Sequence, residues 1–143
     1  GYSWYKAMVV WMKRMLRQAL GPRIYFSDAL LIGLYSSVGE EAFFRGALQP
    51  WLIRWSSEIS NSPDWGIVLG VLGTSITFGV MHAPLVRELR PWTVLAVVMG
   101  GVFGLLAVFS GSLLPPILAH MTINFLNLLR LNEIAVDQED AKE

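Results

Sequence analysis

Residues 92–110 read WTVLAVVMGGVFGLLAVFS, nineteen consecutive residues without a formal charge. A helix of about 20 apolar residues spans the roughly 30 Å hydrocarbon core of a bilayer, so this stretch predicts a membrane-spanning helix. Three further long apolar stretches, residues 24–51, 65–82 and 112–129, predict three more spans. We therefore expect an all-α, polytopic membrane helix bundle with about four transmembrane helices.

The composition supports the membrane interpretation. The 143 residues are 54% apolar, their mean hydropathy is +0.49, and only 15% of them are charged, whereas about 25% are charged in an ordinary soluble domain. Fully buried helices of a soluble protein are the alternative. A chain of this length, however, has no room to surround four such helices with soluble layers.

Charge and cysteine content exclude several classes of function. Eleven basic and eleven acidic residues cancel, so the chain lacks the basic excess that neutralises phosphates, and nucleic acid is not an expected partner. The chain contains no cysteine, which excludes a disulfide framework, a thiolate nucleophile and a cysteine-based zinc site. Histidine and carboxylate side chains remain as chemical candidates.

The chain divides into three segments. Residues 1–22 mix Trp and Met with Lys and Arg, a composition typical of an amphipathic helix at a membrane interface, although a helix packed on protein shows the same pattern. Residues 24–131 predict the membrane domain, and the acidic residues 132–143 predict a flexible tail. Because the first residue is glycine, we expect the sequence to be part of a longer protein.

Turn-forming residues and glycine pairs organise the predicted bundle. Residues 55–64 and 83–91 combine polar residues with proline, and they predict connections between helices, as does Gly111. Two pairs of glycines spaced four apart predict close approach of helices in lipid. These pairs are Gly66 with Gly70 and Gly100 with Gly104.

Ionisable side chains lie within the predicted spans or at their ends. Such a group costs at least a few kcal/mol at membrane depth, so each is a functional candidate by default. Glu41 and Arg45 are four residues apart on one helix face and can neutralise each other. Glu40 lies about 100° around the helix from Glu41, so it can face a cavity instead. The ionisable candidates are Glu40, Glu41, Arg45, His82 and His120.

The second carboxylate, Glu40, suits a site that activates water. A carboxylate in a cavity of low dielectric constant takes up a proton more readily, which suits a general base. His120 and Asn124 share a helix face, because they are four residues apart. Together they can donate hydrogen bonds to an oxyanion or, as neutral imidazole and amide oxygen, approach a metal ion. Each pair of residues spaced four apart has an ordinary structural explanation when taken alone. Pairs of this kind on three helices together favour a functional site.

Three motifs carry these residues in a fixed order. Residues 40–46 read EEAFFRG and match the pattern EExxxR, residues 78–82 read FGVMH and match FxxxH, and residues 120–124 read HMTIN and match HxxxN. With this order and spacing, residues 28–131 resemble the CAAX protease and bacteriocin-processing family of intramembrane endopeptidases. Within that family they resemble the type II CAAX prenyl endopeptidases.

The resemblance implies hydrolysis of a peptide bond in a membrane-associated substrate, either a CAAX-type prenylated tail or a bacterial peptide. It implies that Glu40, with His82, activates water and that His120 and Asn124 stabilise the oxyanion. The ion pair of the first motif then holds that motif in place. The six candidate catalytic residues are Glu40, Glu41, Arg45, His82, His120 and Asn124. The expected partners are the lipid bilayer and the substrate, and the expected location is the bacterial plasma membrane.

Metal dependence is left open by the sequence. Glu40, His82 and His120 can supply three ligands and an open water position, as in catalytic zinc sites. However, no HExxH helix is present, and Asn124 suits a metal-free oxyanion site, which we favour.

Two other functions compete with proteolysis. The first is a non-catalytic membrane module in bacteriocin immunity or protein interaction, against which the intact motifs argue. The second is a proton-coupled transporter, in which membrane Glu and His relay protons, but no duplicated half is visible in the sequence.

Overall fold

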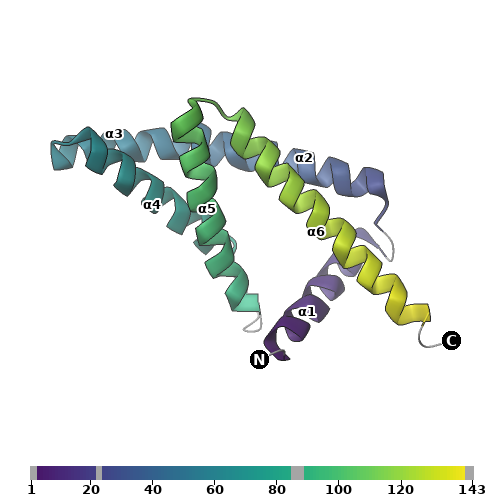
Figure 1. Ribbon diagram of the computed structural model, residues 1–143. Coiled ribbons are helices and arrows are strands. Elements are labelled where there is room, and N and C mark those ends of the chain that lie inside the picture. The colour runs from purple at the N-terminus through teal and green to yellow at the C-terminus, as the bar shows by residue number, and fades with distance from the viewer. Residues whose placement is uncertain (1–2, 22–23, 85–88, 141–143) are drawn as a thin grey trace.

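The computed structural model describes residues 3–21, 24–84 and 89–140 (Figure 1). Within these ranges all regular structure is helical, which confirms the predicted all-α class. The helices are α1 (Ser3–Leu20), α2 (Phe26–Phe43), η1 (Phe44–Leu48), α3 (Gln49–Ser60), α4 (Pro63–Met81), α5 (Arg90–Ser110) and α6 (Leu114–Asp140).

Helices α2 and α3 are joined by η1, a single π-helical turn. Pro50 has no N–H, and its ring would collide with the carbonyl four residues earlier, that of Gly46. The wider π turn relieves this conflict, and the backbone N–H of Gln49 donates to the carbonyl of Phe44. Such turns are frequent at functional sites, and this one begins three residues after Glu41 and contains Arg45 of the first motif.

The connection predicted at residues 55–64 is wrong over most of its length, because α3 continues to Ser60. Serine hydroxyls in this part donate to carbonyls one turn earlier, Ser57 to Ile53 at 2.8 Å and Ser60 to Ser56 at 2.7 Å, so the polar residues are accommodated within the helix. The turn is confined to Asn61, with φ 54°, and the following residue. Gly111, with φ 62°, forms the predicted turn between α5 and α6.

Helix packing depends on the glycine pairs. Helix α3 packs against α4, α4 against α5, and α2 against α6 (Figure 1). A Cβ atom on Gly70 would lie 2.8 Å from the backbone nitrogen of Ile53, and one on Gly100 would lie 3.1 Å from Cα of Ser75. The close helix approach predicted from the glycine spacing is therefore confirmed at these contacts.

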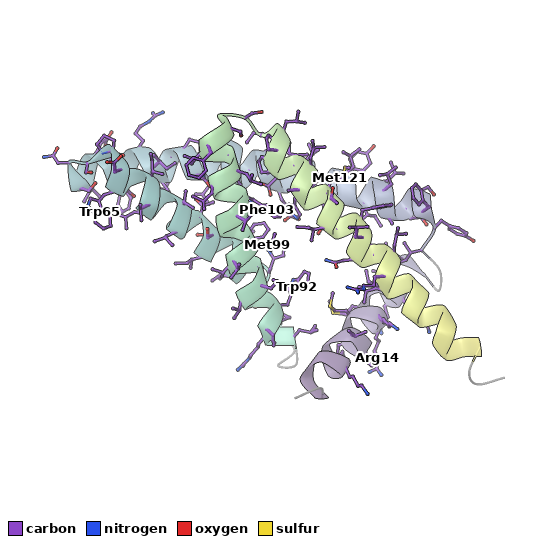
Figure 2. All side chains as sticks on the ribbon, in the orientation of Figure 1. Arg14, Trp65, Trp92, Met99, Phe103 and Met121 are labelled. Carbon is purple, nitrogen blue, oxygen red and sulfur yellow. The ribbon has the colours of Figure 1, made fainter. Side chains whose placement is uncertain are left out.

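Two of the described helices, α4 and α5, are long and apolar enough to cross a membrane. Figure 2 shows Trp65 near the start of α4 and Trp92 near the start of α5, at opposite ends of this helix pair. The other two predicted spans correspond to α2 and to the first part of α6. Helix α2 carries three carboxylates, at Asp28 and in the first motif, and is therefore less apolar than α4 and α5.

Helices lie at both ends of the described chain. The N-terminal segment forms helix α1, which packs against α6, and its location at a membrane interface stays a prediction. The flexibility of residues 132–143 also stays a prediction; α6 continues to Asp140, and the last three residues lie outside the described part. Residues 132–140 contain no glycine or proline, so nothing in them breaks the helix.

Candidate active site

Two consecutive glutamates near the end of α2 occupy different environments. The side chain of Glu41 is fully buried, whereas that of Glu40 is 31% exposed. The rotation of about 100° between consecutive helical residues separates them, as the sequence predicted.

Glu41 is the centre of a buried polar cluster. Its Oε1 atom accepts a hydrogen bond from Nη1 of Arg45 at 2.9 Å, which confirms the predicted ion pair. The same oxygen lies 2.8 Å from Nδ1 of His120, a contact that the spacing did not predict. A carboxylate only accepts hydrogen bonds, so Nδ1 of His120 carries the proton and Nε2 is the nitrogen that faces elsewhere.

Aromatic rings enclose this cluster. The guanidinium carbon of Arg45 lies 4.7 Å from the ring centre of Phe78 and 5.4 Å from that of Phe103, within the range of cation–π attraction. The Phe103 ring also stacks on His120, with ring centres 4.9 Å apart and an angle of 20° between the planes. The rings pack on both polar side chains and help to bury them.

Glu40 faces two imidazoles. Its Oε2 atom lies 3.4 Å from Nε2 of His82 and 3.9 Å from Nε2 of His120. His82 caps the end of α4, and its Nδ1 atom lies 2.7 Å from the carbonyl of Phe78, which orients the ring. Among the described residues Oε2 of Glu40 is buried without a hydrogen-bond partner, so the carboxylate is held near both rings but is bonded to neither.

Asn124 lies one turn beyond His120 on α6, in the wall of a cavity of about 490 Å³ that His82 also lines. Its Nδ2 atom donates to Oγ of Ser36 at 3.1 Å, and Ser36 precedes Glu40 by one turn of α2. The structure therefore brings Glu40, His82 and His120 into one cluster, with Asn124 beside it. Most of the cavity wall is apolar and includes residues of α1, α5 and α6, among them Met12, Met15, Leu16, Trp92 and Leu128.

The metal-free site stays a prediction. Over residues 3–21, 24–84 and 89–140, no three His, Asp or Glu side chains are grouped so that they hold a metal ion as they stand. The separations of 3.4 and 3.9 Å between Glu40 and the two imidazole nitrogens are nevertheless close to the roughly 3.4 Å between ligands of a tetrahedral zinc ion. Without an ion, the chemistry open to the site is proton transfer by Glu40 and hydrogen bonding by the imidazoles and Asn124.

Sequence reasoning missed several neighbours of the site. The Ser36 hydroxyl that holds Asn124 and the Gly100 carbonyl that binds Arg45 have no signal in the motifs. Gln49 is the exception, because it continues the four-residue spacing from Glu41 through Arg45 and is equally buried.

Comparison with known proteins places the chain in a family. No curated protein and no solved structure matches it. The family model described as "Type II CAAX prenyl endopeptidase Rce1-like" matches residues 22–126, which include all three motifs and leave α1 outside the matched range. The chain therefore belongs to the Rce1-like family of type II CAAX prenyl endopeptidases, a family of membrane-embedded proteases.

Proposed function

We propose that this protein is an intramembrane endopeptidase in which Glu40 activates water to hydrolyse a peptide bond. The observation that carries the proposal is the unbonded Oε2 of Glu40, which faces the Nε2 atoms of His82 and His120 next to an apolar cavity. A carboxylate that faces two imidazoles is a combination that general acid–base catalysis uses, and His82 also lines the cavity. Membership of a protease family gives independent support.

The proposed reaction begins with a water molecule between Glu40 and the substrate carbonyl. Glu40 accepts a proton as the water oxygen bonds to the carbonyl carbon. His82, oriented by the Phe78 carbonyl, positions this water through Nε2. The C–N bond then breaks, and Glu40 returns the proton to the leaving amine.

The negative charge that develops on the substrate oxygen needs hydrogen-bond donors. Asn124 offers from the cavity wall the amide N–H that is not donated to Ser36. His120 donates from Nε2 when that atom is protonated, since Nδ1 already donates to the Glu41 carboxylate. In this scheme Glu41 and Arg45 hold His120 and take no direct part in the reaction.

We place residues 24–131 in the membrane as a protease domain with four spans, formed by α2, α4, α5 and the first part of α6. Large exposed apolar side chains cover their outer surfaces, as contact with lipid requires. Helix α1 lies at the interface, where the Arg14 guanidinium packs 5.1 Å from the Trp11 ring, a combination typical of interfacial helices. The expected location is the bacterial plasma membrane.

The proposed substrates are CAAX-type prenylated tails or bacterial peptides inserted in the membrane. Cleavage by the purified protein, in detergent or vesicles, of farnesylated CAAX peptides and matched unmodified peptides would be followed by mass spectrometry. We expect new peptide termini with the wild-type protein and none with the Glu40→Gln variant. Equal product from both proteins, or no product from either, would contradict the proposal, and the latter would favour a non-catalytic role in immunity or protein interaction.

A further inference from the structure

We propose that Gln49 is a positioning residue of this active site and that it acts through helix α5. The inference rests on the proposed function, because it assigns Gln49 to the placement of His120. Gln49 lies outside the three motifs, at the start of α3 and directly after the π turn.

Gln49 and Arg45 bind α5 in the same way. Nε2 of Gln49 donates to the carbonyl of Gly104 at 3.0 Å, and Nη2 of Arg45 donates to the carbonyl of Gly100 at 2.9 Å. As whole residues, both are only 3% exposed. The donors are four residues apart and so are the acceptors, so the two hydrogen bonds fix one helix against the other in a single register.

Glycine at position 104 leaves room for the Gln49 amide, and glycine at position 100 leaves room for helix α4. A Cβ atom on Gly104 would lie 2.7 Å from Oε1 of Gln49, too close for the amide to stay in place. On Gly100 it would meet Cα of Ser75 at 3.1 Å. The carbonyls of α5 have a second lone pair beyond the helical hydrogen bond, and it becomes accessible because the helix surface carries no side chain there.

The register of α5 determines where the Phe103 ring lies relative to the His120 imidazole. Phe103 directly precedes Gly104, and its ring stacks on the His120 imidazole and lies 5.4 Å from the Arg45 guanidinium. Figure 2 shows Phe103 part-way along α5. If the Gln49 bond is lost, the Arg45 bond is the one side-chain hydrogen bond from η1 or α3 to α5 that remains among the described residues. Phe103 then has more freedom to move relative to His120, whose Nε2 atom faces Glu40.

The first arm of the test is kinetic and compares two isosteric changes. Gln49→Leu removes the bond between helices. Thr74→Val is the matched control, since Thr74 is 1% exposed and its hydroxyl bonds only within its own helix, to Gly70. We expect Gln49→Leu to lower kcat about tenfold with KM unchanged, because it removes one buried hydrogen bond that supports the transition state. Thr74→Val should leave kcat unchanged.

The second arm is spectroscopic and needs no activity. The chain has only two histidines, so imidazole NMR signals in detergent can be assigned by replacing each one. We expect Gln49→Leu to shift the ring signals of His120, because the Phe103 ring current changes, and to leave those of His82 in place. Gln49→Met, which is close to Gln in length and volume, serves as a second variant should Gln49→Leu not fold.

The two arms separate the inference from the proposed function. A His120 shift without cleavage by any variant, wild type included, supports the positioning effect and refutes the protease assignment. His120 signals and kcat values that match those of Thr74→Val would overturn the role of Gln49 even if the protein is a protease.

Discussion

The inner and outer halves of the polar cluster differ in how tightly they are held. In the inner half, the Glu41 and Arg45 side chains are both 0% exposed and are joined by a 2.9 Å hydrogen bond. In the outer half, the Glu40 and His82 side chains are 31% and 28% exposed, and Oε2 of Glu40 lies 3.4 Å from Nε2 of His82. His120 contacts both halves, through Nδ1 to Glu41 and Nε2 towards Glu40.

This contrast distinguishes the residues that support the fold from those that are available for the reaction. The inner half is closed to a substrate because both of its side chains are fully buried, although Oε2 of Glu41 and Nε of Arg45 have no hydrogen-bond partner among the described residues. The outer half is partly exposed, and its His82 lines the apolar cavity, so this half is open to a substrate. Substitutions in the outer half should therefore lower activity, whereas substitutions in the inner half should lower stability.

We expect the largest effect from the Glu40→Gln variant, which should lose most of its catalytic activity. Loss of the general base should lower kcat by about 10²–10⁴-fold, while the thermal melting temperature stays close to that of the wild type. Cleavage assays and melting in detergent measure the two effects. Glu58→Gln, on the exposed surface of α3, is the control and should change neither quantity; near wild-type activity of Glu40→Gln would refute the assignment.

Glu41→Gln should act on stability. The substitution leaves the buried Arg45 guanidinium without its counter-charge, and breaking a buried pair in this way costs about 3–5 kcal/mol. We expect a large fall in melting temperature and in folded yield. The double variant Glu41→Gln/Arg45→Met removes both charges and should recover part of the loss, whereas a double variant less stable than either single one would contradict the support role.

Asn124→Leu should produce a smaller loss of activity. Removal of one oxyanion donor lowers kcat by about 10²–10³-fold. Stability should change little, because Ser36, the partner of Asn124, is itself only half-buried. Ser36→Ala serves as the control, since it removes the partner but not the donor and should cost far less activity. Equal kcat losses in the two variants would show that Asn124 acts only through its contact with Ser36.

The sequence predicted more of the site than of its surroundings. Local helix geometry gives two features, the ion pair between Glu41 and Arg45 and the different direction in which Glu40 points. The structure shows both. The contact between His120 and Glu41 joins α6 to α2 across 79 positions, and no periodicity within either helix encodes such a pairing. The same limit applies to Gly100, whose carbonyl is an acceptor for Arg45.

The fold shows a similar division. The helices of the four apolar stretches and the turn at Gly111 follow from local composition. The length of α3 was not predicted, because serine in a sequence indicates a turn as readily as a helix whose hydroxyls bond the preceding turn. The π turn also escaped prediction, although Pro50 provides its cause.

The smallest expected effect is that of metal removal. Zinc at this site would need Glu40, His82 and His120 as ligands, whereas the metal-free site that we favour uses Asn124 as an oxyanion donor and needs no ion. We therefore expect exhaustive chelation, followed by elemental analysis of the purified protein, to leave kcat unchanged. Stoichiometric zinc whose removal abolishes cleavage and whose return restores it would overturn this expectation. The outer half would then be a metal site, and the open coordination of Glu40 would reflect its function as a ligand and not as a base.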